Sequence, residues 1–123
     1  MSTEERLLTV TEEAGVDLSS SQYLFVKMSS DGQIDPCDTA GEDAYGVLQN
    51  DPDAAGKAAT VAWGGVSKIV LGATLSPGAK VQTDANGKAA AAVSGDHVLG
   101  TLRVGGDADE IGEILLASHH IVA

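Results

Sequence analysis

The apolar residues of this chain come in short runs separated by turn-forming residues. Alternation is clearest in HVLGTLRV, where apolar positions recur at every second residue from 98 to 104. A period of two is typical of a half-buried β-strand. The dipeptides Asp31-Gly32 and Asn86-Gly87 are strong tight-turn signals between such runs. With no sustained helical stripe, the pattern predicts an all-β domain of about seven or eight short strands.

We expect seven strands, given at the end of this paragraph, separated by turns and loops. The C-terminal tail, residues 118–123, is expected to be extended. One segment, 34–43, is predicted to be a loop because Pro36 lacks a backbone donor and acidic residues favour turns. Ala89–Ala92 favours a helix by propensity, but it directly follows the Asn-Gly turn and is too short to nucleate one. The predicted strands cover residues 22–28, 44–49, 60–63, 66–71, 89–92, 97–104 and 111–117.

The stretch TVAWGGVSKIVLG, residues 60–72, is the best-formed piece of this pattern. Two apolar runs meet at Gly64-Gly65, which predicts a hairpin because primed turns require the positive φ that glycine allows. Trp63, Val66 and Ile69 are predicted to lie in the core or at a subunit interface. Since the chain has only four aromatic residues, Trp63 is expected to be the central packing residue.

Residues 1–19 differ from the rest, because charged residues surround a short apolar patch of Leu7, Leu8 and Val10. We interpret this segment as an extended N-terminal arm, either a disordered tail or a strand added to the sheet of a partner. Residues 20–123 are then expected to form a small antiparallel β-barrel or sandwich. The exposed edges of such a fold invite pairing with a neighbour.

Composition narrows the classes of partner. Eighteen acidic and seven basic residues give a net charge of −11, which disfavours nucleic acid and anionic membrane surfaces. The acidic surface suits a partner with basic patches or a saline environment, and it is also compatible with a simple solvated face. The single cysteine, Cys37, has no partner within the chain and no metal-ligand spacing around it. The N-terminus has no basic region or long apolar run, so neither a secretory signal nor a transmembrane helix is expected.

Candidate chemistry is sparse, and the sequence predicts no enzyme, no cofactor and no metal site. The loop GGDADE gathers Asp107, Asp109 and Glu110, but such a run is more often solvated than ligating. His119 and His120 are adjacent on an extended segment and should point to opposite faces. An alternative function stays open, namely a small β-barrel module that binds a carbohydrate or a divalent cation through Trp63 or this loop.

The order of features between Ala44 and Leu116 resembles that of capsid decoration proteins, also called cement proteins, of tailed bacterial and archaeal viruses. The resemblance lies in the GVLQ strand, the AG and ATVA segment, the G-V-x-K strand and the TDANG turn, followed by GDHVLGTLRV and GEILL. These motifs are structural glycines and turn residues, and they contain no catalytic chemistry.

This resemblance implies a β-barrel or β-tulip-like domain on the outside of an icosahedral shell. It implies a virion structural protein, made in the host cytoplasm, that stabilises the capsid by bridging major capsid protein subunits and that assembles as a homotrimer. Members of the family use the N-terminal arm to pair with capsid segments. On that basis Leu7, Leu8 and Val10 are the expected capsid contacts.

Overall fold

The computed structural model describes the backbone of residues 7–121 and the side chains of residues 7–116. Within this range the chain is all-β and contains no helix, as the alternating pattern predicts. The nine strands are β1 (Leu7–Ala14), β2 (Phe25–Ser30), β3 (Gln33–Pro36), β4 (Gly46–Leu48), β5 (Ala58–Val70), β6 (Lys80–Thr83), β7 (Ala89–Ala91), β8 (His97–Val104) and β9 (Ile111–Ile121).

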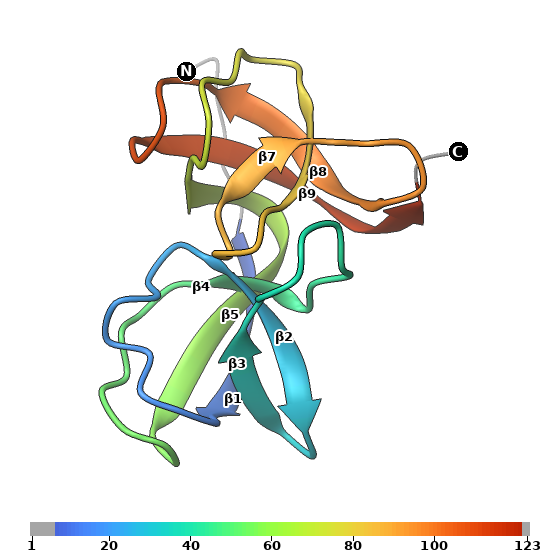
Figure 1. The fold of residues 1–123 in the computed structure, drawn as a ribbon. Helices are drawn as coiled ribbons and strands as arrows, with labels where there is room; N and C mark the ends of the chain where they lie inside the picture. The colour runs from blue at the N-terminus through green and yellow to red at the C-terminus, as the bar shows by residue number, and fades with distance from the viewer. Residues whose placement is uncertain (1–6, 122–123) are drawn as a thin grey trace.

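The strands form two lobes that share β5 (Figure 1). Hydrogen bonding follows the order β1-β3-β2-β4-β5-β9-β8-β6-β7. Strand β1 pairs in parallel with β3 and antiparallel with β5, so the first five strands close into a small ring. The other lobe is antiparallel and contains the β8–β9 hairpin together with β6 and β7. This architecture confirms the expectation of a small barrel-like or sandwich-like β fold.

The buried apolar side chains form two clusters, one inside the ring lobe and one that fills the other lobe and reaches Phe25 and Val47 of the ring strands β2 and β4. The ring lobe is filled by Ala14, Leu18, Val26, Ile34, Leu48, Ala59 and Val61. The other cluster contains Phe25, Cys37, Val47, Ile69, Leu71, Leu75, Val81, Ala89, Leu99, Leu102 and Ile114. Most of these side chains are small or medium in size, which agrees with the few aromatic residues in the sequence. Two thin cores therefore replace the single core that a chain of this length would ordinarily form.

The predicted hairpin at Gly64-Gly65 is wrong, because both glycines lie inside the continuous strand β5. The first half of β5 pairs with β1 and β4, and its second half pairs with β9. A hairpin would pair the two halves with each other, and here the partners come from three other strands. Gly65 still adopts a positive φ of 83°, so glycine is needed for a local change of direction within the strand.

Trp63 is the extra residue of a β-bulge, which corrects its expected position at the centre of the core. Leu8 pairs with Gly64 and Thr9 pairs with Ala62, so Trp63 has no opposite residue on β1. A bulge changes the direction in which the side chain of its extra residue points. Trp63 accordingly points toward solvent and is 48% exposed. Ile69 is fully buried, whereas Val66 is half-buried.

The described part of the N-terminal segment lies in the sheet. From Leu7 to Glu13, β1 pairs with β5 along its length, with the single irregularity at Trp63. Ala14 and Leu18 are fully buried in the ring lobe. Residues 7–19 are therefore integrated into the fold, and the remainder of the predicted arm, residues 1–6, lies outside the described residues.

Two predicted turns are confirmed and one predicted loop is partly wrong. Asp31-Gly32 connects β2 and β3, and Asn86-Gly87 connects β6 and β7. The segment 34–43 begins with the end of β3, since Pro36 pairs opposite Val26 at the end of the strand, where its missing donor costs little.

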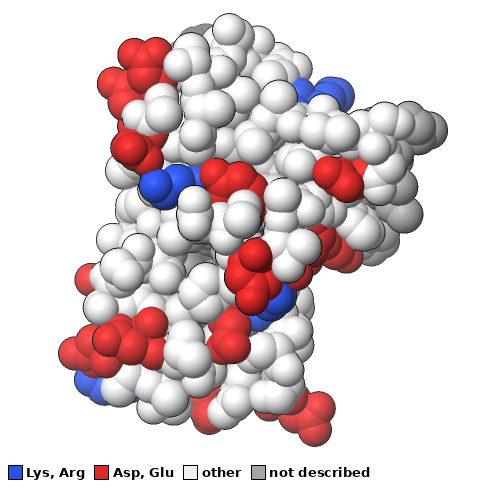
Figure 2. Space-filling view, in the orientation of Figure 1, with Lys and Arg blue, Asp and Glu red and all other residues white. Residues whose placement is uncertain are grey.

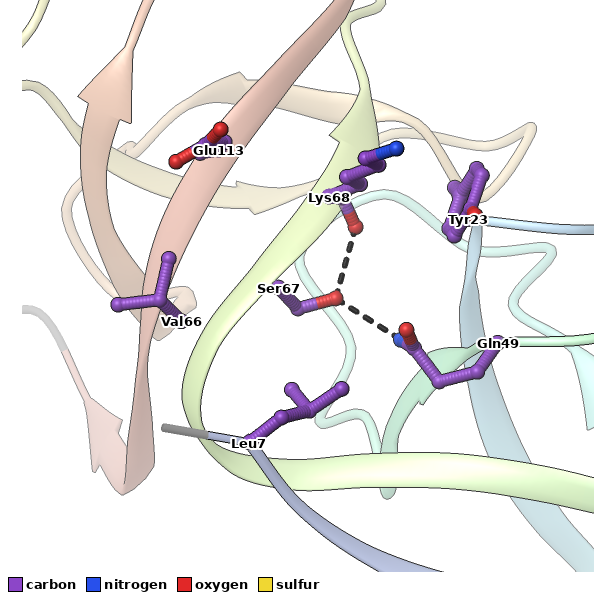
Figure 3. A pocket seen from close by; sticks show the side chains of 7 residues that line it. All are labelled: Leu7, Tyr23, Gln49, Val66, Ser67, Lys68 and Glu113. Atoms are coloured by element: carbon purple, nitrogen blue, oxygen red, sulfur yellow. Dashed lines mark hydrogen bonds between the residues drawn. The ribbon is translucent and has the colours of Figure 1, made fainter. Parts of the chain in front are cut away.

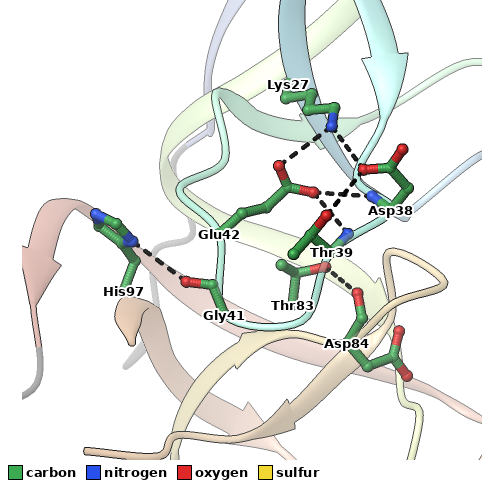
Figure 4. A network of polar contacts seen from close by, with 8 residues as sticks. All are labelled: Lys27, Asp38, Thr39, Gly41, Glu42, Thr83, Asp84 and His97. Carbon is green, nitrogen blue, oxygen red and sulfur yellow. Dashed lines mark hydrogen bonds and ion pairs between the residues drawn. The ribbon is translucent and has the colours of Figure 1, made fainter. Parts of the chain in front are cut away.

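The rest of that loop joins the two lobes through polar contacts (Figure 4). Lys27 Nζ lies 2.6 Å from Asp38 Oδ1 and 3.2 Å from Glu42 Oε1. The other Glu42 oxygen accepts the backbone N–H groups of Asp38 and Thr39 at 2.8 Å each. Gly41 donates to the carbonyl of Thr83 and accepts from the backbone N–H of His97, so the loop is bonded to both lobes.

The different burial of Trp63 and Ile69, six residues apart in β5, makes a stability prediction. Ile69→Ala should lower the free energy of unfolding by about 2 to 5 kcal/mol, because it leaves a cavity in a packed core. Trp63→Ala should cost about 1 kcal/mol or less, since half of its side chain already faces solvent. Urea unfolding of both variants, at concentrations where the chain is monomeric, tests the ranking. A larger loss for Trp63→Ala would contradict the bulge.

Cys37 provides a second test of the fold. Burial raises the pKa of its thiol to about 12, and only 1% of the side chain is exposed. The thiolate is the reactive form, so its population near neutral pH should fall roughly a thousandfold relative to an ordinary cysteine. We expect Ellman's reagent to modify the native protein very slowly and the urea-unfolded protein at once. Equal rates in the two states would show that this part of the core is open.

Candidate functional site

The most exposed aromatic surface lies around the bulge. Trp63 and Tyr45 are 48% and 37% exposed, and both line a shallow groove with Gly46 and Leu116. Leu116 belongs to β9, where it pairs opposite Gly65. The groove therefore lies where the two lobes meet, and its rim combines residues from β5, β9 and the segment before β4. We call this surface the Trp63 groove, defined by Ala44, Tyr45, Gly46, Trp63, Leu99 and Leu116.

Tyr45 is held in place by β1. Its hydroxyl donates to Glu12 Oε2 at 2.5 Å, and this hydrogen bond to the carboxylate, together with burial, raises the pKa of Tyr45. The ring is thus fixed beside Trp63 and presents a flat apolar surface. Exposed aromatic side chains with one anchored polar end are typical of protein interfaces.

The groove is too small to be a preformed ligand pocket. Its volume is about 20 Å³, which accommodates roughly one water molecule. A sugar ring could only lie across the rim and would not be enclosed. The geometry therefore favours a contact surface for another macromolecule over a pocket that binds a carbohydrate at Trp63.

The three predicted arm contacts differ in their accessibility. Leu7 and Leu8 are 41% and 47% exposed, at the end of β1 next to the bulge. Leu8 lies against Gly64, where an added Cβ atom would approach its Cδ1 within 3.2 Å. Val10 is half-buried and packs against the core of the ring lobe. Leu7 and Leu8 are thus available for a partner, while Val10 mainly holds β1 to its own lobe.

A second hollow of about 210 Å³ lies on another side of the same junction (Figure 3). Leu7 and Val66 give it an apolar part, while Tyr23 and Lys68 lie at the other end. Gln49 Nε2 donates to Ser67 Oγ at 2.8 Å, and that hydroxyl donates to the carbonyl of Lys68 at 2.8 Å. Glu113 completes the lining.

The charged surface is acidic over both lobes, with few basic groups (Figure 2). Most described basic residues already contact carboxylates. Lys57 lies 2.5 Å from Asp53, Lys88 lies 2.7 Å from Asp109, and Arg103 forms an ion pair with Glu113. The hydrogen bond from Lys57 lowers the pKa of Asp53. The many acidic side chains without such partners leave a negative surface, which would attract basic groups on a partner.

The acidic loop 105–110 uses its carboxylates within the protein. Glu110 accepts the backbone N–H of Asp107 at 2.7 Å, and Asp109 pairs with Lys88. Among the described residues, no group of three or more His, Cys, Asp or Glu side chains is arranged to hold a metal ion. The side chains of His119 and His120 lie outside the described set. No helix in residues 7–121 is long and apolar enough to cross a membrane.

Sequence reasoning missed several residues of this junction. The sequence pattern places Tyr45 in a predicted strand but indicates no function for it. It places Glu12 in the charged N-terminal segment and indicates no contact with Tyr45. Lys68 and Tyr23 are 45 positions apart in the chain, yet the Lys68 ammonium lies 5.7 Å from the centre of the Tyr23 ring. Only the pairing of β1, β4 and β9 with β5 brings these residues together, and no local signal in the sequence carries that information.

Comparison with known proteins identifies the fold without identifying a sequence family. No protein-family model matches the chain, and no curated protein sequence matches it. Among solved structures, the chain is similar to the N base of the head fiber protein gp8.5 of bacteriophage phi29, with a TM-score of 0.72 and 14% sequence identity. The match covers 96% of this chain and 100% of the other. The two chains therefore share a fold over nearly their whole lengths.

Proposed function

We propose that this chain is a virion structural protein that binds the outer surface of a viral capsid and stabilises it by bridging major capsid protein subunits. The observation that carries the proposal is the shared fold with a phage head fiber base, over nearly the full length of both chains. The order of motifs that resembles capsid decoration proteins supports the same role independently. The chemistry of the described surface agrees, because it presents exposed apolar and acidic groups.

The capsid contact is assigned to the exposed end of β1. Leu7 and Leu8 are exposed apolar residues at a strand end, where a partner can add both side-chain and backbone contacts. The net charge of −11 on the chain favours a basic docking site on the shell. Many copies bound to one lattice reinforce one another, so each individual contact can be modest.

The Trp63 groove is assigned to contacts between copies of this chain, which we propose form a homotrimer. A monomer gains nothing from placing its only tryptophan half in solvent, and large exposed aromatic residues are enriched at interfaces. None of the residues that line the groove is charged, so copies could meet there without bringing charged side chains of the lining into contact. Elsewhere each copy carries the excess negative charge that opposes association at low salt.

The capsid assignment is tested by co-sedimentation with shells assembled from the major capsid protein of the same genome. The double variant Leu7→Ser, Leu8→Ser should weaken binding by about tenfold, because it removes two exposed apolar contacts. Val93→Ser is the matched control, since Val93 is 56% exposed on the other lobe. Point variants are preferable to deletion of residues 1–19, which would also remove buried Ala14 and Leu18. Failure of the unaltered chain to bind at any salt concentration would reject the proposal.

The self-association assignment is tested by sedimentation equilibrium. We expect a trimer that becomes more stable from low salt to about 1 M salt, because screening reduces the repulsion between acidic copies. Trp63→Ser should shift the chain to monomers, while Val93→Ser should not. A chain that stays monomeric at every salt concentration, or trimers unaffected by Trp63→Ser, would refute this use of the groove.

A further inference from the structure

The hollow beside Lys68 has features that the capsid proposal does not use. Lys68 is exposed, and within the described residues no carboxylate lies within ion-pair distance of it and no hydrogen bond uses its ammonium group. Its opposite residue on β9 is Glu113, which forms its ion pair with Arg103 instead. Among the described residues Lys80 also has no carboxylate partner, but its ammonium donates to Thr101 Oγ1, whereas no hydrogen bond or ion pair engages the ammonium of Lys68.

The ammonium group is positioned by an aromatic ring. Lys68 Nζ lies 5.7 Å from the centre of the Tyr23 ring, a distance at which a cation and a π face attract each other. This contact places the charge at the hollow but leaves the N–H donors of the ammonium available. Lysine donates up to three hydrogen bonds, and an anionic oxygen is the strongest acceptor for them.

Tyr23 has the left-handed backbone conformation, with a φ of 64°, which is rare for a residue other than glycine. Two backbone hydrogen bonds hold it there, from Tyr23 N to the carbonyl of Leu48 at 2.7 Å and from Val70 N to the carbonyl of Tyr23 at 2.9 Å. Strained conformations of this kind persist where the surrounding structure fixes them, and they concentrate at functional sites. Here the conformation places the ring at the junction of the two lobes.

The other end of the hollow is apolar. Leu7 is 41% exposed at its rim, and Val66 is half-buried beside it. Between the two ends, Gln49 and Ser67 are bonded to each other and form a fixed polar wall. Figure 3 shows Leu7 at one end and Lys68 with Tyr23 at the other. A volume of about 210 Å³ is larger than a carboxylate group needs, so an apolar neighbour fits as well.

We propose that this hollow binds an acidic side chain, with an adjacent apolar residue, on a segment of a partner protein. The carboxylate would accept from Lys68, and the apolar residue would cover Leu7 and Val66. An acidic segment is repelled by most of this negative surface, so the hollow would be a preferred point of attachment. Such a contact sets the register of a partner more than it adds affinity. The inference goes beyond capsid binding and does not require self-association, although the hollow shares Leu7 with the proposed capsid contact.

The test uses the full chain alone, without capsids, and follows backbone amide NMR shifts during peptide titrations. The probes are acetyl-Leu-Glu-Leu-amide, its Gln counterpart and inorganic phosphate. We expect the Glu peptide to shift the amides of Tyr23, Gln49 and Lys68, and to bind about three- to tenfold more tightly than the Gln peptide. Lys68→Gln should remove that difference. Lys80→Gln is the matched control, because Lys80 is an exposed lysine whose ammonium donates to Thr101 Oγ1 at 2.9 Å.

Several outcomes would overturn the inference. They are equal affinity for the Glu and Gln peptides, loss of preference in both lysine variants, absence of binding, and phosphate binding as tightly as the Glu peptide. The last result would identify a general anion site instead of a peptide site. None of these results affects the co-sedimentation test, so failure of this inference and failure of the capsid proposal can be told apart.

Discussion

The structure depends on the continuity of β5. Val61, near one end of this strand, is buried in the ring lobe, and Ile69, near the other end, is buried in the second lobe. Its backbone hydrogen-bonds to β1, β4 and β9, so a single strand organises both lobes of the sheet. Because each core is small, the apolar surface buried in one lobe alone contributes little to the free energy of unfolding. Because β5 belongs to both lobes, packing in one core also stabilises the strand on which the other core is built.

The bulge at Trp63 connects this constraint to the proposed function. A strand that serves two lobes must change direction between them, and the bulge with Gly65 provides that change. The same irregularity turns Trp63 toward solvent beside Tyr45. A structural requirement of the fold thus creates an exposed aromatic surface at the lobe junction, and the Lys68 hollow lies at the same junction. The features proposed for contacts between copies and with a partner both follow from the path of one strand.

Electrostatics adds a second condition on any assembly. Contacts between copies must overcome a net charge of −11 on each chain, so apolar patches are the places where association can begin. Most basic residues are already paired, and this leaves little positive surface for an acidic partner. Within the described chain, Lys68 and Lys80 are the two lysines without a carboxylate in ion-pair distance, and the Lys80 ammonium donates to Thr101. A partner with basic groups would therefore be attracted by much of this surface. An acidic segment has few favourable positions, and the hollow beside Lys68 is one of them.

The sequence by itself determined the all-β class, the turns at Asp31-Gly32 and Asn86-Gly87, and the strands 97–104 and 111–117 that correspond to β8 and β9. These features are local, because alternation and turn chemistry act over a few neighbouring residues. The sequence also showed that aromatic residues are few and that the acidic charge restricts the classes of partner.

Only the tertiary structure decided how distant strands pair, and the wrong predictions have this cause. Gly64-Gly65 is typical of a turn, but the backbone of β5 pairs with β1, β4 and β9 on either side of these glycines, and the strand therefore stays continuous. Trp63 has the size of a core residue, but a bulge set by the register of β1 exposes it. Likewise, the meeting of Lys68 with Tyr23 depends on pairing between segments far apart in the chain. Register is fixed by long-range burial and hydrogen bonding, which a local pattern does not contain.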